Sequence, residues 1–392
     1  MTLSPRGHAM SATPVLSLVI ATRERAVTLG HSLQTALNQQ SQAFEVIVSD
    51  NFSADATAQV VADIRDSRLR YFRTDARLSM CDNYEFALQQ ARGEYVVFIG
   101  DDDAVMPGAI DRLLGEIRDG EADTIYMWPL HVYDWPVGDQ PAKIGHLAPQ
   151  TSRSRLDLAA TARRVVTLGG WKYYKLPSPY HCAVPRRFLD QIRERTGRVF
   201  HSTQPDVFTA MALPTVARHV VNLGRTVTLN GRSASSNGLA FVVKSALQNI
   251  QKFIAEYGGY RFHASLAPGF PGQANMIPDA VLIACDLFPE FYGGTRFNYD
   301  SMWAYICRVR FVSPRDVIRR RAEIRKSHPF HVLPFLAFLA VHEAAVVRRK
   351  LLNRQTDLGP VGRDVPATIS AFVAALQMQQ AGPKAIPAVD SR

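Results

Sequence analysis

The first 135 residues alternate short, β-branched apolar runs with longer stretches whose apolar positions recur three and four residues apart. The short runs are typical of buried strands, and the longer stretches are typical of amphipathic helices. Such an alternation predicts parallel strands joined by crossover helices. The five predicted strands are Val15–Thr22, Phe44–Asp50, Leu69–Thr74, Glu94–Gly100 and Asp123–Leu130.

Local signals agree with this pattern and mark where it changes. Ser79 is placed to cap a helix, and Gly120 is placed to end one. After about Asp134 a Pro/Gly-rich stretch interrupts the alternation, and beyond Ser235 the periodicity is mostly helical. We therefore expect disordered tails at 1–13 and 381–392, two halves of an α/β domain at 14–135 and 136–235, and a mainly helical region at 236–380.

Composition indicates a globular chain without a zinc or disulfide framework. The chain has 392 residues, 47% of them hydrophobic, which is enough to bury a large core. Its cysteines, Cys81, Cys182, Cys285 and Cys307, are far apart and form no Cys-x-x-Cys pair. We see no secretory signal pattern and no uncharged apolar run long enough to span a bilayer. A cytoplasmic protein is expected.

The positive charge is concentrated near the C-terminus. Between Arg308 and Arg354 there are twelve Lys or Arg residues and three acids, so this segment holds nine of the ten net positive charges. It surrounds an apolar stretch that polar residues such as His342 and Glu343 interrupt. Two interpretations remain open: a surface that contacts anionic membrane from the cytoplasmic side, or a core helix with a solvated basic end. Nucleic acid is not expected as a partner.

Polar residues follow four of the predicted strands. Ligands bind at the carboxyl ends of the strands in open α/β sheets, so these residues are candidates for a binding site. The strand ends are Thr22-Arg23, Asp50-Asn51, Thr74-Asp75 and Asp101-Asp102-Asp103.

The three consecutive aspartates need an explanation, because like charges repel. An acidic cluster is either a solvated helix start or a seat for a cation. The chain after the first strand, "ATRERAVTLG", has neither the dinucleotide nor the P-loop glycine pattern. A nucleotide phosphate would therefore have to be held in another way, and a metal ion on carboxylates is the obvious one.

Four stretches in order resemble the inverting family 2 glycosyltransferases of the GT-A fold. They are "LSLVIATRERAVTLGHSLQTALNQ", "FEVIVSDNFSADAT", "NYEFALQQARGEYVVFIGDDD" and "MPGAI". The resemblance implies a Rossmann-like, mostly parallel sheet flanked by helices. It also implies transfer of a sugar from a nucleoside diphosphate sugar, most naturally UDP-linked, to a glycan or lipid-linked acceptor of a bacterial cell-surface polysaccharide.

The resemblance also assigns roles to individual residues. Asp102 and Asp103 would bind Mn²⁺ or Mg²⁺, which would neutralise charge on the leaving diphosphate. Asp206, at a predicted helix start in "FHSTQPDVFTAM", would be the base that takes the proton of the acceptor hydroxyl. The residues assigned to the nucleoside and ribose are Thr22, Arg23, Glu24, Asp50, Asn51, Arg77, Asn83 and Asp101. Asn51 departs from the family, which usually has an acid there.

Other side chains have ordinary structural alternatives. Trp171, Tyr173, Tyr174 and Tyr180 are either an acceptor platform or packing under a loop. His181 and His201 are either ligands or ordinary core and surface residues. Two rival functions also remain: a sugar-phosphate nucleotidyltransferase, which would need a Gly-rich loop that "ATRERA" lacks, and a non-catalytic subunit that binds sugar nucleotides.

Overall fold

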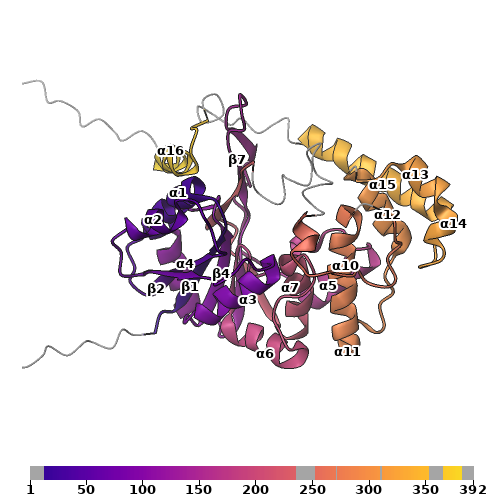
Figure 1. Ribbon diagram of the computed structural model, residues 1–392, viewed down its shortest axis with the longest axis horizontal. Helices are drawn as coiled ribbons and strands as arrows, with labels where there is room; N and C mark the ends of the chain where they lie inside the picture. Colours follow the sequence, from indigo (N-terminus) through magenta and orange to yellow (C-terminus); the bar gives the residue numbers. More distant parts are fainter. Residues whose placement is uncertain (1–12, 235–251, 271, 310, 353–364, 382–392) are drawn as a thin grey trace, which may run out of the picture.

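The computed structural model describes residues 13–234, 252–270, 272–309, 311–352 and 365–381 (Figure 1). Nearly all of the two tails predicted from the sequence lies outside these ranges. The central element is an eight-stranded sheet, in the order β3-β2-β1-β4-β10-β6-β11-β9.

The first half of the sheet is parallel. Its strands are β1 (Leu16–Thr22), β2 (Phe44–Asp50), β3 (Leu69–Arg73) and β4 (Tyr95–Gly100). β1 pairs with β2 and β4, and its register sets Thr22 beside Asp50 and Ala21 beside Gly100. The carboxyl ends of these strands therefore meet at one edge of the sheet.

The second half of the sheet is mixed. Its strands are β6 (Thr124–Met127), β9 (Ser154–Arg155), β10 (Cys182–Pro185) and β11 (His219–Asn222). β10 runs antiparallel between β4 and β6, whereas β11 is parallel to β6. The fifth predicted strand is present as β6, but β10 separates it from β4. The predicted α/β class, with a large sheet between helices, is confirmed.

A second sheet of four strands lies beside the end of β4, in the order β5-β12-β7-β8. Its strands are β5 (Ala104–Val105), β7 (His131–Asp134), β8 (Lys143–His146) and β12 (Thr228–Arg232). β5 follows the three aspartates directly, and it pairs with β12. This pairing brings residues 230–233 next to the aspartates, from which they are far apart in sequence.

Helices cover both faces of the large sheet, because alternate side chains of each strand point to opposite faces. On one face, Leu16, Leu18 and Ile20 pack with α1, α4 and α16. On the other, Val19 and its neighbours pack with α3, α5, α6, α7 and α10. The bounds of these and of α2 are α1 (Ala26–Leu37), α2 (Thr57–Ala62), α3 (Met80–Gln90), α4 (Ala109–Asp119), α5 (Leu158–Thr167), α6 (Arg186–Thr196), α7 (Pro205–Ala212), α10 (Gly272–Leu287) and α16 (Ile369–Ala381).

The last helix, α16, returns to the beginning of the chain. It lies beside α1 in Figure 1, and its Ile369, Phe372 and Val373 are buried in the same cluster as β1. The division made from the sequence grouped this helix with the C-terminal region at 236–380. Its apolar face instead covers the N-terminal half of the sheet.

The helical C-terminal region is present and forms a lobe around the buried Trp303. Its helices are α11 (Pro289–Tyr292), α12 (Tyr299–Arg308), α13 (Pro314–Arg319), α14 (Arg321–Ile324) and α15 (Val332–Leu352). Two short 3-10 helices, Tyr173–Lys175 and Leu213–Thr215, complete the elements. No helix among the described residues is long and apolar enough to cross a membrane.

Candidate active site

A cleft of about 750 Å³ opens at the carboxyl ends of β1 and β4. The parallel register brings these ends together, and β12 and the start of α7 form the other walls. Nine of the eleven residues to which the resemblance assigns roles line the cleft: Thr22, Arg23, Glu24, Asn51, Arg77, Asn83, Asp101, Asp102 and Asp206. Asp50 and Asp103 are fully buried behind it.

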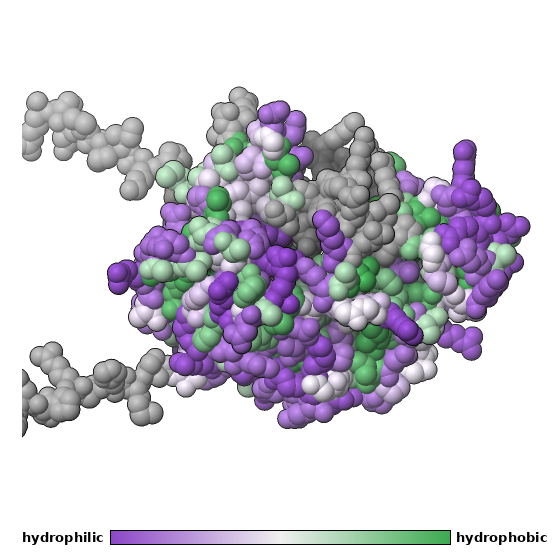
Figure 2. All heavy atoms as spheres, in the orientation of Figure 1, coloured by the Kyte–Doolittle hydropathy of each residue, from purple (hydrophilic) through white to green (hydrophobic). Residues whose placement is uncertain are grey.

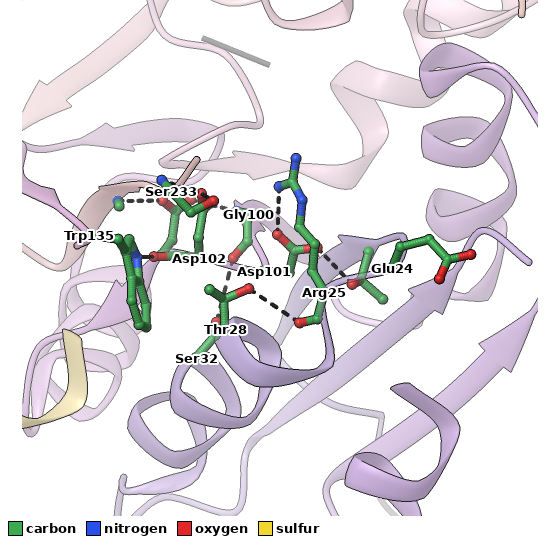
Figure 3. Close-up of polar contacts among 12 residues, drawn as sticks. Glu24, Arg25, Thr28, Ser32, Gly100, Asp101, Asp102, Trp135 and Ser233 are labelled. Carbon is green, nitrogen blue, oxygen red and sulfur yellow. Dashed lines mark hydrogen bonds and ion pairs between the residues drawn. The ribbon is translucent and has the colours of Figure 1, made fainter. Parts of the chain in front are cut away.

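Asp101 joins the ends of β1 and β4. Its Oδ2 atom accepts a hydrogen bond from the Thr22 hydroxyl at 2.7 Å, and its Oδ1 atom accepts one from the Arg25 guanidinium at 2.8 Å (Figure 3). Burial alone would lower the pKa of Arg25, but the charges of Asp101 and Asp102 outweigh burial and raise it. Arg25 is therefore a fixed cation in the wall of the cleft.

Asp102 is held from one side only. Its Oδ2 atom accepts hydrogen bonds from the Ser233 amide at 3.0 Å and the Ser233 hydroxyl at 2.6 Å, while its backbone carbonyl accepts from Trp135 Nε1 at 2.9 Å. Its Oδ1 atom has no hydrogen-bond partner among the described residues. Burial, followed by the negative charges of Asp103 and Asp101, raises the pKa of this carboxyl.

Asp103 has a different environment, because donors surround both of its oxygens. Burial would raise the pKa of Asp103, but the neighbouring His181 and backbone amides outweigh that effect and lower it. The donors are Gly231 N at 2.7 Å and Asn230 Nδ2 at 3.3 Å to Oδ1, and Gly100 N at 2.5 Å, the Tyr180 hydroxyl at 2.9 Å and His181 Nε2 at 3.1 Å to Oδ2. The side chain is 0% exposed.

The hydrogen-bond donors around Asp102 and Asp103 determine which of the two carboxylates could bind a metal ion. Among the described residues there is no group of three or more His, Cys, Asp or Glu side chains arranged to hold one. Mg²⁺ and similar ions on nucleotides are nevertheless often held by one or two carboxylates together with phosphate oxygens. Asp102 fits that pattern, because its Oδ1 atom has no partner among the described residues and its charge is poorly solvated. Asp103 does not, since all its lone pairs face donors within the fold.

The residues assigned to the nucleoside are anchored by the strand ends. Asp50 is 0% exposed, and it accepts hydrogen bonds from the Tyr71 hydroxyl at 2.6 Å and the Ser53 amide at 2.9 Å. The Asn51 amide group exchanges two hydrogen bonds of 2.8 Å with the backbone of Leu78. Both side chains thus stabilise the loop that borders the cleft, and Asn51 also lines it.

Three residues of this group, Arg23, Glu24 and Arg77, lie nearer to solvent. Arg23 forms an ion pair with Glu256 at 2.9 Å. Arg77 lies 3.8 Å from Glu24, and both of these side chains are about half exposed. Asn83, on α3, is buried and accepts a hydrogen bond from Ser49 at 2.8 Å. The two arginines leave charged, adjustable groups at the mouth of the cleft.

Asp206 lies in the first turn of α7, after Pro205, on the opposite wall. Burial raises the pKa of its carboxyl, and the helix backbone amides offset this in part. Its charge also reaches Tyr84: burial, followed by the charges of Asp206, Asp103 and Asp101, raises the pKa of the Tyr84 hydroxyl. Asp206 therefore faces the same enclosed space as the acidic turn.

The aromatic and histidine candidates separate into different roles. Tyr173 and Tyr180 line the cleft, whereas Trp171 is buried against His342 and Tyr174 is 62% exposed. His181 is buried behind the cleft, with Thr228 and Asp103 as partners. His201 contacts Thr196 and the ring of Phe208, and it does not line the cleft. The four aromatic residues thus do not form one platform.

Sequence reasoning missed Arg25 and Ser233, which contact the aspartates directly. Arg25 could have been found, because it lies three residues beyond the end of the first predicted strand. Ser233 has no local signal, since its position depends on the pairing of β12 with β5.

The comparisons with known proteins agree with this geometry. The family model described as glycosyl transferase family 2 matches residues 17–178, which include β1, β4 and the three aspartates. The match to glycosyl transferase family 2 thus covers residues 17–178. The predicted family is therefore confirmed for the part of the chain that builds most of the cleft.

Two curated relatives match part of the chain. A GalNAc(5)-diNAcBac-PP-undecaprenol beta-1,3-glucosyltransferase of Campylobacter jejuni is 35% identical over 112 residues, 28% of this chain and 36% of the relative. The succinoglycan biosynthesis protein ExoO of Rhizobium meliloti is 31% identical over 106 residues, 27% of this chain and 30% of the relative. The chain thus spans about a third of the length of the curated relatives it matches.

A solved structure extends the likeness to the fold of most of the chain. The crystal structure of S. aureus TarS 1-349 in complex with UDP-GlcNAc superimposes with a TM-score of 0.50 and 15% identity, over 84% of this chain and 92% of that one. At this identity the likeness concerns the fold alone. It supports the GT-A architecture predicted from the sequence.

Proposed function

We propose that the protein is a metal-dependent, inverting glycosyltransferase that moves a sugar from a nucleoside diphosphate sugar, most simply a UDP-sugar, to an acceptor hydroxyl. The observation that carries the proposal is the pairing of Asp101 with Arg25 next to Asp102, whose Oδ1 atom has no partner among the described residues. Both lie at strand ends within the segment that matches family 2. A cation and a partly satisfied carboxylate suit a diphosphate and its metal ion.

In the proposed complex, the nucleoside lies against the ends of β1 and β2. Thr22, Arg23 and Glu24 line its pocket, together with Asn51, Arg77 and Asn83. Asp50 supports it from behind, with one carboxylate oxygen bonded to Tyr71. Asp101 meets the ribose. Each of these roles follows from the family resemblance and from the position of the residue at the cleft.

The diphosphate lies over the acidic turn. Mn²⁺ or Mg²⁺, held by Asp102 and phosphate oxygens, would supply charge neutralisation for the leaving group. Asp103 supports this arrangement indirectly, because it fixes the turn through His181, Tyr180 and Gly231. Arg25 supplies a second positive charge that the fold itself provides.

Asp206 is the proposed base. As the acceptor oxygen attacks the anomeric carbon, its proton passes to the Asp206 carboxylate, and the bond from that carbon to the diphosphate breaks. A single displacement of this kind inverts the anomeric configuration. Burial raises the pKa of Asp206, which makes the carboxylate a stronger base than an exposed aspartate.

The acceptor is proposed to be a glycan on a lipid carrier, in the synthesis of a bacterial cell-surface polysaccharide. The printed names of the two relatives support this class: one is a glucosyltransferase named with a diphosphoundecaprenol-linked substrate, and the other is a succinoglycan biosynthesis protein. We assign residues 14–135 to donor binding and 136–235 to acceptor binding, and we place the protein in the cytoplasm or at the inner membrane surface.

A donor screen tests the proposal. Thermal unfolding would be followed with a panel of nucleotide sugars, each with Mn²⁺ and with EDTA, since a bound ligand raises the apparent stability. We expect one UDP-sugar to raise the unfolding temperature with Mn²⁺ only. Release of UDP on addition of acceptor would then separate an enzyme from a binding subunit, and release of pyrophosphate from a nucleoside triphosphate would indicate a nucleotidyltransferase instead.

A further inference from the structure

The long helix α15 has two different apolar faces. Its inner face packs on α12, and Phe335 and His342 are buried there. Its outer face bears Leu333, Leu336 and Val341, which are 79%, 41% and 57% exposed. Helices on the surface of a soluble protein normally turn polar residues outward, so this outer face is unusual.

The exposed apolar side chains of α15 form one continuous stripe, and the exposed Glu343 borders it. With 100° between successive residues, Leu333, Leu336, Val341 and Val347 fall on the same side, and the exposed Ala337, Ala340 and Ala344 lie between them. The stripe is about 21 Å long at 1.5 Å per residue. It holds four of the ten large apolar side chains that are exposed among the described residues, so the apolar surface is concentrated there.

Basic residues flank the stripe on both sides in the sequence. Before it, Arg319 and Arg320 are paired with acids. Arg321 and Arg325 instead donate to backbone carbonyls, and no acid among the described residues forms an ion pair with either. After it, the last turns of α15 contain Arg348, Arg349 and Lys350 in the sequence. Figure 2 shows hydrophilic side chains gathered at the right-hand end of the molecule, where α13 and α14 are labelled in Figure 1.

We propose that the outer face of α15 docks on the surface of an anionic lipid bilayer. An amphipathic helix with basic flanks lies in the membrane interface with its apolar stripe among the acyl chains and its cations on the headgroups. The charge complementarity favours a lipid surface over a second copy of this chain, whose matching face would be equally basic.

The same helix contacts Trp171, which is close in sequence to a wall of the cleft. The ring of His342 lies 4.1 Å from that of Trp171, centroid to centroid, and Trp171 comes two residues before Tyr173, which lines the cleft. Docking through α15 would thus hold the cleft near the membrane. This use of the surface, to meet a lipid-linked acceptor, rests on the proposed function, whereas the docking itself does not.

Co-sedimentation of the full chain with vesicles tests the proposal. Phosphatidylcholine vesicles with and without about 25% phosphatidylglycerol would be compared at low and high salt. The variant Leu333→Glu/Val341→Glu changes the stripe, and Val27→Glu/Met378→Glu is the matched control, because it charges two equally exposed apolar side chains on α1 and α16. Circular dichroism would check folding, and light scattering would give the oligomeric state.

We expect the wild type and the control to sediment with anionic vesicles at low salt, and the stripe variant to lose at least about tenfold in partitioning. Wild-type protein that stays in the supernatant, or a stripe variant that sediments as the wild type does, would overturn the proposal. The proposal would also be overturned if the stripe variant were a monomer, the wild type an oligomer, and both partitioned equally onto the vesicles, because the stripe would then be an interface between copies of the chain. UDP binding measured on the same samples tests the proposed function separately.

Discussion

Arg25 and Asp101 form an ion pair of 2.8 Å across the ends of β1 and β4. The pair places a partly buried positive charge beside the acidic turn, where a diphosphate would otherwise meet three carboxylates. Its strength depends on low exposure, since the Asp101 side chain is 2% exposed and that of Arg25 is 20% exposed. In the proposed donor site, this pair supplies the positive charge that comes from the protein, whereas the metal ion supplies the other.

Removal of this cation should weaken donor binding. For Arg25→Ala we expect UDP affinity to fall by about tenfold or more, because a charge-assisted contact is lost and Asp101 keeps an uncompensated charge. Arg25→Lys should recover part of the affinity. Calorimetry with Arg118→Ala as control, an arginine in an exposed pair with Asp119, would measure the effect. Equal affinity of Arg25→Ala and the wild type would contradict the assigned role.

The base assignment predicts a separation of binding from chemistry. Asp206→Asn should bind UDP as the wild type does, while transfer falls about a hundredfold or more, a typical loss for a general base. Steady-state transfer assays and UDP calorimetry on the same preparation would measure both. If turnover stays near the wild-type value, the base must be sought among other residues.

The same substitution has a predicted effect on stability. Burial raises the pKa of Asp206 in the folded protein above its ordinary value of 3.8, so ionisation destabilises the native state as the pH rises above that range. The amide side chain of the Asp206→Asn variant carries no charge at any pH. We therefore expect this variant to unfold at a higher temperature than the wild type at pH 7, with the difference shrinking toward about pH 4. A variant that is less stable at pH 7 would refute this explanation.

The acidic turn also depends on a close approach of β12. A Cβ atom on Gly231 would lie 1.7 Å from the Asp102 carbonyl oxygen, so Gly231→Ala must displace the turn. We expect a loss of about 1–3 kcal/mol in the free energy of unfolding, together with weaker UDP binding. Gly294→Ala is the control, since nothing lies within 4 Å of an added Cβ there. Denaturant unfolding of both variants would measure the loss. Equal unfolding curves for Gly231→Ala and Gly294→Ala would contradict the close contact between Gly231 and Asp102.

Local patterns predicted the part of the fold that depends on neighbouring residues. Ser79 caps α3 through a hydrogen bond from the Asp82 amide, and Gly120 ends α4, as the sequence indicated. Parallel pairing of the first strands brings Thr22 to Asp101, so the edge of the cleft was predictable from strand ends.

Long-range contacts were not predictable in this way. Ser233 reaches Asp102 only because β12 pairs with β5. His181, which contacts Asp103, has a backbone φ of 60°, and the local sequence does not indicate that conformation. The position of α16 against α1 likewise depends on a match between two apolar faces at opposite ends of the chain. Such contacts between distant segments depend on how the whole chain packs, and the periodicity of apolar residues does not indicate which segments meet.

The most direct test of the account is a UDP titration by calorimetry with Mn²⁺ and with EDTA, on the wild type and on Asp102→Asn. The account predicts binding by the wild type with Mn²⁺, little binding with EDTA, and little binding by Asp102→Asn in either buffer, because the amide replaces the one carboxylate that fits the metal ion. Equal UDP affinity of the wild type in both buffers, or full metal-dependent binding by Asp102→Asn, would contradict it.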